Sequence, residues 1–286
     1  MLTTTQVKQF YELGYLILPK IISADLIDRL KQALEQTREK VNQTPTEYNA
    51  RLITKQGEVS DTWGVNNIFS PQLYDRCYDD IMSEDKILKP IQDLIGKELR
   101  FWGAHALWSP QQNDYELYWH RDMVTPEIYE PTGKPNHVQC NIPTFIDNCF
   151  HVIPGSHRRP PTEQELTQMK NGESNELPNE VVVTCFPGDV LLMNAWTIHR
   201  GVCSFNQIRR TMHFCLQPKN ELYGGKASPS WMRDKTYLNS LNDSTRELMR
   251  NLINWDDEHP LSHDELIELR RKSKSNREYL TKQSKK

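Results

Sequence analysis

The stretch FPGDVLLMNAWTIHRGV, residues 186–202, decides the fold. It begins with the turn residues Pro187, Gly188 and Asp189, continues through an apolar run and reaches His199. An apolar run of this length after a turn is typical of a buried strand. Comparable runs, separated by turn residues and not by helices, lie at 99–108, 137–142, 181–186 and 211–216. Short strands in this succession predict a mainly β fold, a sandwich or a jelly roll.

The segments on both sides of this core have helical patterns. Thr3 and Gln6 have the spacing of a capping box, and a helical apolar stripe runs from Leu26 to Leu34. Residues 15–19 predict one short strand between these two helices. We expect residues 1–98 to be mainly helical, 99–217 to form the β core, and 218–286 to be a helical C-terminal extension. Residues 40–62, 125–136 and 160–180 are polar, so we expect loops or a lid at the rim of the core.

Length and charge limit the possible function classes. A chain of 286 residues allows one large domain or two modest ones. The 35 Lys and Arg residues against 38 Asp and Glu residues leave a net charge of −3, which disfavours a nucleic-acid partner. Residues 270–286 hold eight basic residues and one acid, +7, which leaves −10 on residues 1–269. A solvated basic tail is the expected reading of that segment.

The sequence also predicts where the protein works. No apolar run approaches the roughly 18 residues that a membrane span requires, and the N-terminal residues lack the pattern of a secretion signal. The six cysteines are scattered without CxxC spacing. We therefore expect a cytoplasmic protein with reduced thiols and no membrane partner.

A candidate metal site emerges from the spacing of two histidines and one acid. His120 and Asp122 are two residues apart, so on a strand both side chains emerge on one face. His199 lies at the end of the apolar run described above. Two histidines and one carboxylate on one side of a metal form the facial triad of non-haem Fe(II) oxygenases, which leaves three positions open. The same ligands also suit Zn²⁺ or manganese.

An arginine pair follows the last of these ligands. Arg209 and Arg210 lie 10 and 11 residues beyond His199 and open another predicted strand. A guanidinium that enters the core beside the metal would bind the far carboxylate of 2-oxoglutarate, whose keto-acid end chelates iron. A surface basic pair is the structural alternative.

These residues resemble the phytanoyl-CoA dioxygenase family of Fe(II)/2-oxoglutarate oxygenases over nearly the whole chain. The segments that carry the resemblance agree with the family in order: TQVKQFYELGYLILP at 5–19, WHRD at 119–122, DNCFHVIPGSH at 147–157, PGDVLL at 187–192, His199 and the arginine pair. Asn148 stands where the family usually has Gly.

The resemblance implies a double-stranded β-helix core in a single domain, residues 1–286. It also implies His120, Asp122 and His199 as iron ligands, with 2-oxoglutarate and O₂ as cosubstrates. One of the two arginines would anchor 2-oxoglutarate. Family spacing favours Arg210, and the family's habit of a small residue after the anchor favours Arg209, which we prefer.

Other candidate pocket residues come from the neighbouring strands. Gln139 and Asn141 alternate with Cys140, so both are candidates to face inward near the cosubstrate, and a structural role is equally open. Arg121, between two candidate ligands, and His105 and Trp108, on the first long strand, are candidates for the substrate pocket.

The predicted activity is hydroxylation of an unactivated C–H bond in a small molecule, such as an amino acid, a natural product or another small acid, with release of succinate and CO₂. The carboxylate of Asp122 disfavours chlorination, because related halogenases have a small residue at that position. Desaturation, cyclisation or epimerisation by the same machinery stays open. Outside the oxygenases, the alternatives are a non-catalytic 2-oxoglutarate or metal-binding protein and a zinc or manganese hydrolase or isomerase. The sequence does not predict the oligomeric state.

Overall fold

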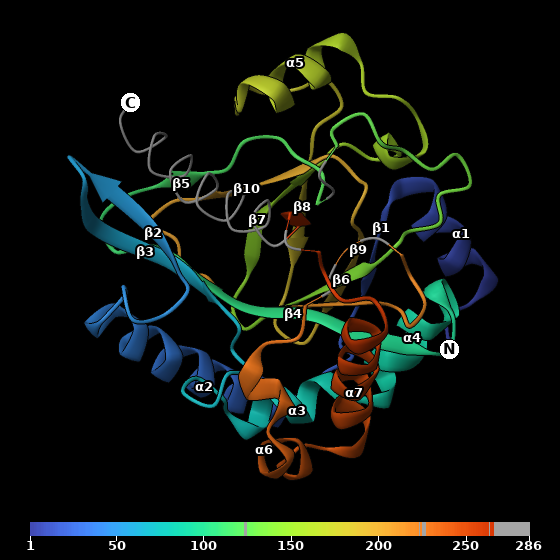
Figure 1. Ribbon diagram of the computed structural model, residues 1–286. Helices are drawn as coiled ribbons and strands as arrows, with labels where there is room; N and C mark the ends of the chain where they lie inside the picture. The colour runs from blue at the N-terminus through green and yellow to red at the C-terminus, as the bar shows by residue number, and fades with distance from the viewer. Residues whose placement is uncertain (123–124, 223, 225–226, 263, 266–286) are drawn as a thin grey trace.

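The computed structural model describes residues 1–122, 125–222, 224, 227–262 and 264–265. Eleven strands are found in this part of the chain, in two antiparallel sheets that face one another (Figure 1). The larger sheet has the order β1-β9-β6-β11-β4-β3-β2 and the smaller one β5-β10-β7-β8. This strand order is that of a double-stranded β-helix, as predicted.

The larger sheet contains the long first and last strands of the core. Its members are β1 (Tyr15–Leu18), β2 (Ala50–Lys55), β3 (Glu58–Asn66), β4 (Leu99–Trp108), β6 (Val138–Pro143), β9 (Val190–Asn194) and β11 (Arg210–Pro218). The smaller sheet consists of β5 (Tyr115–Glu116), β7 (Asp147–Val152), β8 (Val181–Cys185) and β10 (His199–Cys203). All five residues of β9 are buried, which explains why that strand reads as a continuous apolar run.

Helices cover the outer face of the larger sheet, on the lower side of Figure 1. They are α2 (Ala24–Gln43), α3 (Arg76–Met82), α4 (Asp85–Ile95), α6 (Lys235–Ser240) and α7 (Asp243–Glu258), and α1 (Thr4–Leu13) lies beside β1. The described residues also contain two short 3₁₀ helices, η1 (Ser156–Arg158) and η2 (Ser230–Arg233). The apolar stripe of α2, including Leu30 and Leu34, packs with the outer side chains of the sheet, such as Phe214, in the main core.

The capping box at Thr3 and Gln6 is confirmed, because Thr3 Oγ1 accepts from the Gln6 backbone N–H and the Gln6 side chain accepts from the Thr3 backbone N–H.

The C-terminal extension is helical in α6 and α7. The basic tail, residues 270–286, lies outside the described residues. Within them, no helix combines the length and apolar character that crossing a bilayer requires.

The expected loop at 40–62 is wrong. The end of α2 and the hairpin β2–β3 occupy most of that segment and extend the larger sheet past β4. The hairpin turns at Gln56 and Gly57, whose φ angles are 51° and 88°. Two consecutive positive φ values are the signature of a type I′ turn. The side chains at the exposed tip of the hairpin are polar, so the composition of this segment did not indicate two strands.

The polar segment 160–180 also contains a regular element, the helix α5 (Glu163–Asn171). Thr162 and Glu165 form a capping box at its start.

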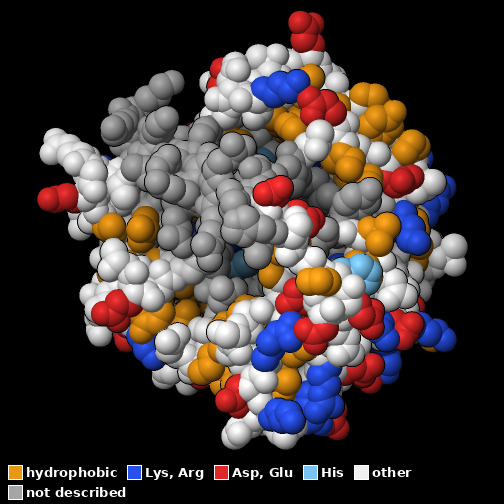
Figure 2. All heavy atoms as spheres, viewed as in Figure 1, with side chains coloured by type: hydrophobic (Ala, Val, Ile, Leu, Met, Phe, Trp, Pro, Cys, Tyr) orange, Lys and Arg blue, Asp and Glu red, His pale blue; other side chains and the backbone are white. Residues whose placement is uncertain are grey.

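On the face shown in Figure 2, the described Lys and Arg side chains lie among Asp and Glu side chains and form no extended area of one charge.

Candidate active site

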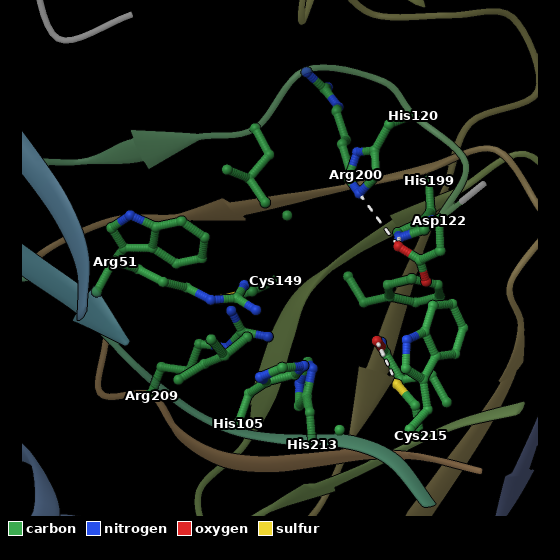
Figure 3. Close-up of a pocket in the computed structure, with 18 of the residues that line it drawn as sticks. Arg51, His105, His120, Asp122, Cys149, His199, Arg200, Arg209, His213 and Cys215 are labelled. Atoms are coloured by element: carbon green, nitrogen blue, oxygen red, sulfur yellow. Dashed lines mark hydrogen bonds and ion pairs between the residues drawn. The ribbon is translucent and has the colours of Figure 1, made fainter. Parts of the chain in front are cut away.

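A cavity of about 300 Å³ lies between the two sheets (Figure 3). Strands of both sheets contribute to its wall. Among the described residues, the wall carries three arginines, five histidines and one acid: Arg51, Arg200, Arg209, His105, His120, His137, His199, His213 and Asp122.

Five histidines face this cavity, which is more than the packing of an apolar core requires. The volume lies at the small end of the range that small-molecule sites occupy. The concentration of titratable side chains in one concave site makes it the candidate active site.

His120, Asp122 and His199 meet at one end of the cavity. Their ligand atoms all lie within 4.8 Å of one another. Asp122 Oδ1 is 3.8 Å from His120 Nε2 and 3.7 Å from His199 Nε2. The spacing arises from a β-bridge, because His120 and His199 exchange backbone hydrogen bonds of 3.0 Å in both directions.

Both histidines are oriented by hydrogen bonds from the ring nitrogen that faces away from the centre. His120 Nδ1 donates to the Tyr118 carbonyl at 2.8 Å, and His199 Nδ1 donates to the Thr197 carbonyl at 2.9 Å. Each Nε2 therefore carries its lone pair toward Asp122, as a metal ligand requires.

The charges at this end favour a cation. Burial lowers the pKa of His120 to about 4, and the neighbouring His199 acts in the same direction, so the His120 ring is neutral at pH 7. Burial alone raises the pKa of Asp122, but His199, His137 and His120 together hold it well below its usual range. Asp122 Oδ2 is buried and has no hydrogen-bond partner among the described residues. Two imidazole Nε2 atoms and an unsatisfied carboxylate oxygen fit a divalent metal ion.

His137 is a neighbour of this cluster that the sequence did not single out. Its Nε2 lies 3.9 Å from Asp122 Oδ2, and its Nδ1 donates to Asn136 Oδ1 at 2.9 Å. The Trp102 ring stands edge-on against it with centroids 3.6 Å apart. His137 therefore borders the side of Asp122 that faces away from the two ligand histidines. The only signal for it was its position at the start of the strand that follows the HxD motif.

The structure separates the two arginines of the pair. Arg209 lines the cavity, donates from Nε to Asp147 Oδ2 at 2.9 Å and donates from Nη1 to the Tyr115 hydroxyl. Arg210 lies outside the cavity, where its Nε donates to Glu35 Oε2 at 2.5 Å. Alternation along β11 produces this split, since adjacent residues of a strand face opposite sides. Arg209 is therefore the member of the pair that can reach a ligand in the cavity.

Arg51 is the second residue that the sequence did not reveal. It comes from β2, in the segment expected to be a loop, and its guanidinium enters the cavity above that of Arg209 (Figure 3). Its Nε and Nη2 donate to Asn66 Oδ1 at 3.1 and 3.0 Å, and its guanidinium lies 4.9 Å from the centre of the Trp63 ring. Only the pairing of β2 with β3 brings this side chain inward.

His105, a candidate for the substrate pocket, and Gln139, a candidate contact for the cosubstrate, both line the cavity. His105 faces His213 across the β4–β11 pair, and burial lowers the pKa of His105 to about 3. Asn141 lies in register with His213 but is not part of the cavity wall. Its Oδ1 is buried without a hydrogen-bond partner among the described residues.

Arg121 and Trp108 require correction, because neither reaches the cavity. Arg121 is 4% exposed and donates to the carbonyls of Trp196 and Ser156 at 2.7 and 3.1 Å. It points to the opposite side from its neighbours His120 and Asp122, as strand alternation dictates. Trp108 is buried on the other face from His105, three residues away, and its Nε1 donates to Thr62 Oγ1 at 3.0 Å.

The fold and the cluster together define a double-stranded β-helix protein with a two-histidine, one-carboxylate site at one end of its barrel. The model of the phytanoyl-CoA dioxygenase (PhyH) family matches residues 10–212, and the chain belongs to this family. All three residues of the cluster and both arginines lie within the matched range.

Individual relatives agree with this assignment. An ectoine dioxygenase of Stutzerimonas stutzeri is 23% identical over 157 residues, which are 53% of this chain and 49% of that protein. The chain therefore matches about half the length of this curated relative.

Solved structures of the same fold include AviO1 from Streptomyces viridochromogenes, with a TM-score of 0.61, 16% identity and coverage of 78% of this chain and 100% of that one. EctD from S. alaskensis, with 2-oxoglutarate and 5-hydroxyectoine, has a TM-score of 0.60, 18% identity and coverage of 80% and 82%. HygX from Streptomyces hygroscopicus, with nickel, 2-oxoglutarate and hygromycin B bound, has a TM-score of 0.57, 17% identity and coverage of 82% and 95%.

Proposed function

We propose that this protein is an Fe(II)/2-oxoglutarate-dependent dioxygenase that hydroxylates an unactivated C–H bond of a small molecule. The observation that carries the proposal is the meeting of His120, Asp122 and His199 at one end of a cavity that also contains Arg209. Family membership and an ectoine dioxygenase relative support the same chemistry. With Fe(II), 2-oxoglutarate and O₂ bound, such a site couples the oxidation of a C–H bond to the release of succinate and CO₂.

The three ligand residues would hold a metal ion from one side only. His120 and His199 would each supply Nε2, and Asp122 would supply a carboxylate oxygen, which leaves the cavity side of the metal for organic ligands and oxygen. Because the Tyr118 and Thr197 carbonyls fix the two rings, little reorganisation is needed when the metal binds. His137 lies 3.9 Å from the buried second oxygen of Asp122, and Trp102 packs edge-on against the His137 ring, so His137 would help to keep bulk water from that oxygen.

Arg209 would bind the distal carboxylate of 2-oxoglutarate. Asp147 and Tyr115 hold its Nε and Nη1, and its Nη2 has no hydrogen-bond partner among the described residues. Gln139, which also lines the cavity, is a further candidate contact for the cosubstrate. The role of Asn141 is then a structural one below the cavity surface.

The substrate class rests on the relatives, among which are an ectoine dioxygenase and a protein bound to hygromycin B. We propose a small polar molecule, an amino acid, a natural product or another small acid. Desaturation, cyclisation or epimerisation would use the same residues, since the outcome after hydrogen abstraction depends on how the substrate is placed.

We further propose that residues 1–286 form one domain, since helices from both flanks pack on the same sheet. A cytoplasmic location is proposed on the cysteine usage: all six cysteines are buried and free.

The test is turnover of 2-oxoglutarate. Purified protein with Fe(II) and ascorbate should convert 2-oxoglutarate to succinate slowly, and faster with its own substrate. His199→Ala should abolish this conversion, whereas His151→Ala, outside the cavity wall, should retain it. A non-catalytic binding protein would bind 2-oxoglutarate and produce no succinate with any candidate substrate. A zinc hydrolase or isomerase would bind metal and show no affinity for 2-oxoglutarate.

A further inference from the structure

The cavity contains a cation that forms no ion pair with an acidic side chain among the described residues. Arg200 pairs with Glu116 and Glu180, and Arg209 pairs with Asp147. Arg51, the third arginine of the wall, forms no ion pair with any residue that the structure describes. Its contacts there are the amide oxygen of Asn66 and the face of Trp63.

Arg51 is nevertheless held in a fixed place. Asn66 lies on β3 beside the strand that carries Arg51, and it accepts from two nitrogens of one guanidinium. Trp63, also on β3, packs on the Tyr115 ring with centroids 4.7 Å apart. Because Tyr115 accepts from Arg209, the hairpin β2–β3 and the Arg209 side chain belong to one packed unit.

The two guanidinium groups converge. Figure 3 shows those of Arg51 and Arg209 pointing toward one another beside Cys149. Burial lowers the pKa of Arg51 to about 10, and the charge of Arg209 acts in the same direction, so Arg51 is still a cation at neutral pH. Two like charges that face one another in a buried site repel, and an anion between them removes that repulsion.

Donors are also free at this point. Neither Nη1 of Arg51 nor Nη2 of Arg209 has a hydrogen-bond partner among the residues in the described ranges. On the same wall, His105 Nδ1 and His213 Nε2 are buried and likewise lack partners there. Buried polar atoms without partners are costly in a protein interior, so this end of the cavity is built for a polar ligand.

We propose that Arg51 and Arg209 bind one carboxylate between them, and that this group is the distal carboxylate of 2-oxoglutarate. The inference rests on the proposed function and adds Arg51 as a residue that selects the cosubstrate. One guanidinium comes from the residue just before the core strand β11 and the other from the N-terminal hairpin, so cosubstrate binding joins the hairpin to the barrel. A carboxylate that accepts from two guanidinium groups is bound more tightly than one that accepts from a single arginine.

The experiment compares two ligands on three variants. Protein loaded with Mn(II) is titrated by calorimetry with 2-oxoglutarate and with 2-oxopentanoate, which has the same chain and chelating end but no distal carboxylate. Arg51→Gln should weaken 2-oxoglutarate binding at least tenfold and change 2-oxopentanoate binding less than twofold. Arg51→Lys, which keeps the charge, should recover part of the affinity. Arg210→Gln, the control outside the cavity, should bind both ligands like the wild type.

The outcomes separate the two proposals. If the wild-type protein binds Mn(II) but not 2-oxoglutarate, the proposed function fails. If the wild type binds 2-oxoglutarate and Arg51→Gln binds it equally well, the Arg51 proposal is overturned. An equal loss for both ligands also overturns it, because Arg51 would then act on the pocket as a whole and not on the carboxylate. Circular dichroism of each variant establishes that it is folded, and Arg51→Lys carries the comparison if Arg51→Gln is not.

Discussion

Asp147 Oδ2 accepts from Arg209 Nε at 2.9 Å inside the barrel, and the same oxygen accepts from the Thr211 hydroxyl. Burial alone raises the pKa of Asp147, but Arg209 and these hydrogen bonds lower it to about 2. The pair thus joins β7 of the smaller sheet to the start of β11 in the larger one. It determines the direction in which Arg209 enters the cavity.

Asp147→Asn should therefore weaken both the fold and the cosubstrate site. Removing one charge of a buried pair costs about 3 kcal/mol of unfolding free energy, because the other charge stays buried without a counter-ion. We expect the dissociation constant of 2-oxoglutarate to rise about tenfold, because the charge-assisted hydrogen bond that orients Arg209 is lost. Urea unfolding and calorimetry measure the two effects.

Glu35→Gln is the matched control for Asp147→Asn. It removes the acidic partner of Arg210, and the Glu35 side chain is partly exposed. The expected cost in unfolding free energy is therefore under about 1 kcal/mol, and 2-oxoglutarate binding should be unchanged. Equal effects of the two substitutions would show that the Asp147 pair has no special role.

Arg209→Gln and Arg210→Gln should differ sharply in turnover. Arg209→Gln removes the donor that faces the cavity, so the KM for 2-oxoglutarate should rise on the order of a hundredfold, as expected for loss of a buried charge-assisted contact. Arg210→Gln should leave this KM within about twofold, since Arg210 lies outside the cavity. A larger effect at Arg210 would reverse the assignment of the anchor.

Arg121→Met tests whether Arg121 supports the fold or the substrate. The substitution leaves the Trp196 and Ser156 carbonyls without their donor, which should cost about 2 kcal/mol of unfolding free energy. Because the side chain points away from the cavity, the KM for the organic substrate should not change. A selective rise in that KM without loss of stability would restore Arg121 to the substrate site.

Much of the architecture follows from the sequence. The apolar run of β9 and the turn before it predict the β core, and the two-residue spacing of His120 and Asp122 predicts their common face. Strand alternation also predicts the orientation of Arg121 and Trp108. Arg121 is next to His120, and Trp108 is three residues from His105, so each lies an odd number of residues from a side chain that faces the cavity. Applied consistently, it would have placed both on the far side.

The rest depends on tertiary contacts that a local pattern does not contain. The polar tip of the hairpin β2–β3 gives no strand pattern, and Arg51 reaches the cavity because β2 pairs with β3 and β3 pairs with β4. His137, the residue before β6, lies beside Asp122 only in the folded chain, with its Nε2 3.9 Å from Asp122 Oδ2. No spacing in the sequence connects either residue with the HxD motif.

His157 gives a prediction for pH. Its side chain is fully buried, and its Nε2 donates to the Tyr11 carbonyl at 2.9 Å. Burial lowers the pKa of His157 to about 4, below its value in the unfolded chain. As the pH falls, the unfolded chain therefore binds a proton at His157 at a higher pH than the folded protein does. The stability that neutral His157 gives the fold is present above pH 6.5 and is lost as the pH falls toward 4.

Between pH 7 and pH 5 this histidine should account for about 2 kcal/mol of lost unfolding free energy. His157→Gln keeps a donor for the Tyr11 carbonyl and removes the titration. The variant should lose correspondingly less stability over the same range in urea unfolding. Parallel pH profiles for the variant and the wild type would contradict the account of His157.

The central claim is that His120, Asp122 and His199 bind Fe(II) so that 2-oxoglutarate chelates it from the cavity side. Anaerobic titration of the Fe(II)-loaded protein with 2-oxoglutarate tests this most directly, because a 2-oxo acid chelated to Fe(II) gives a visible charge-transfer absorption. We predict that the band saturates at one 2-oxoglutarate per chain and is absent in His120→Ala. A wild-type protein that binds Fe(II) and develops no such band would contradict the claim.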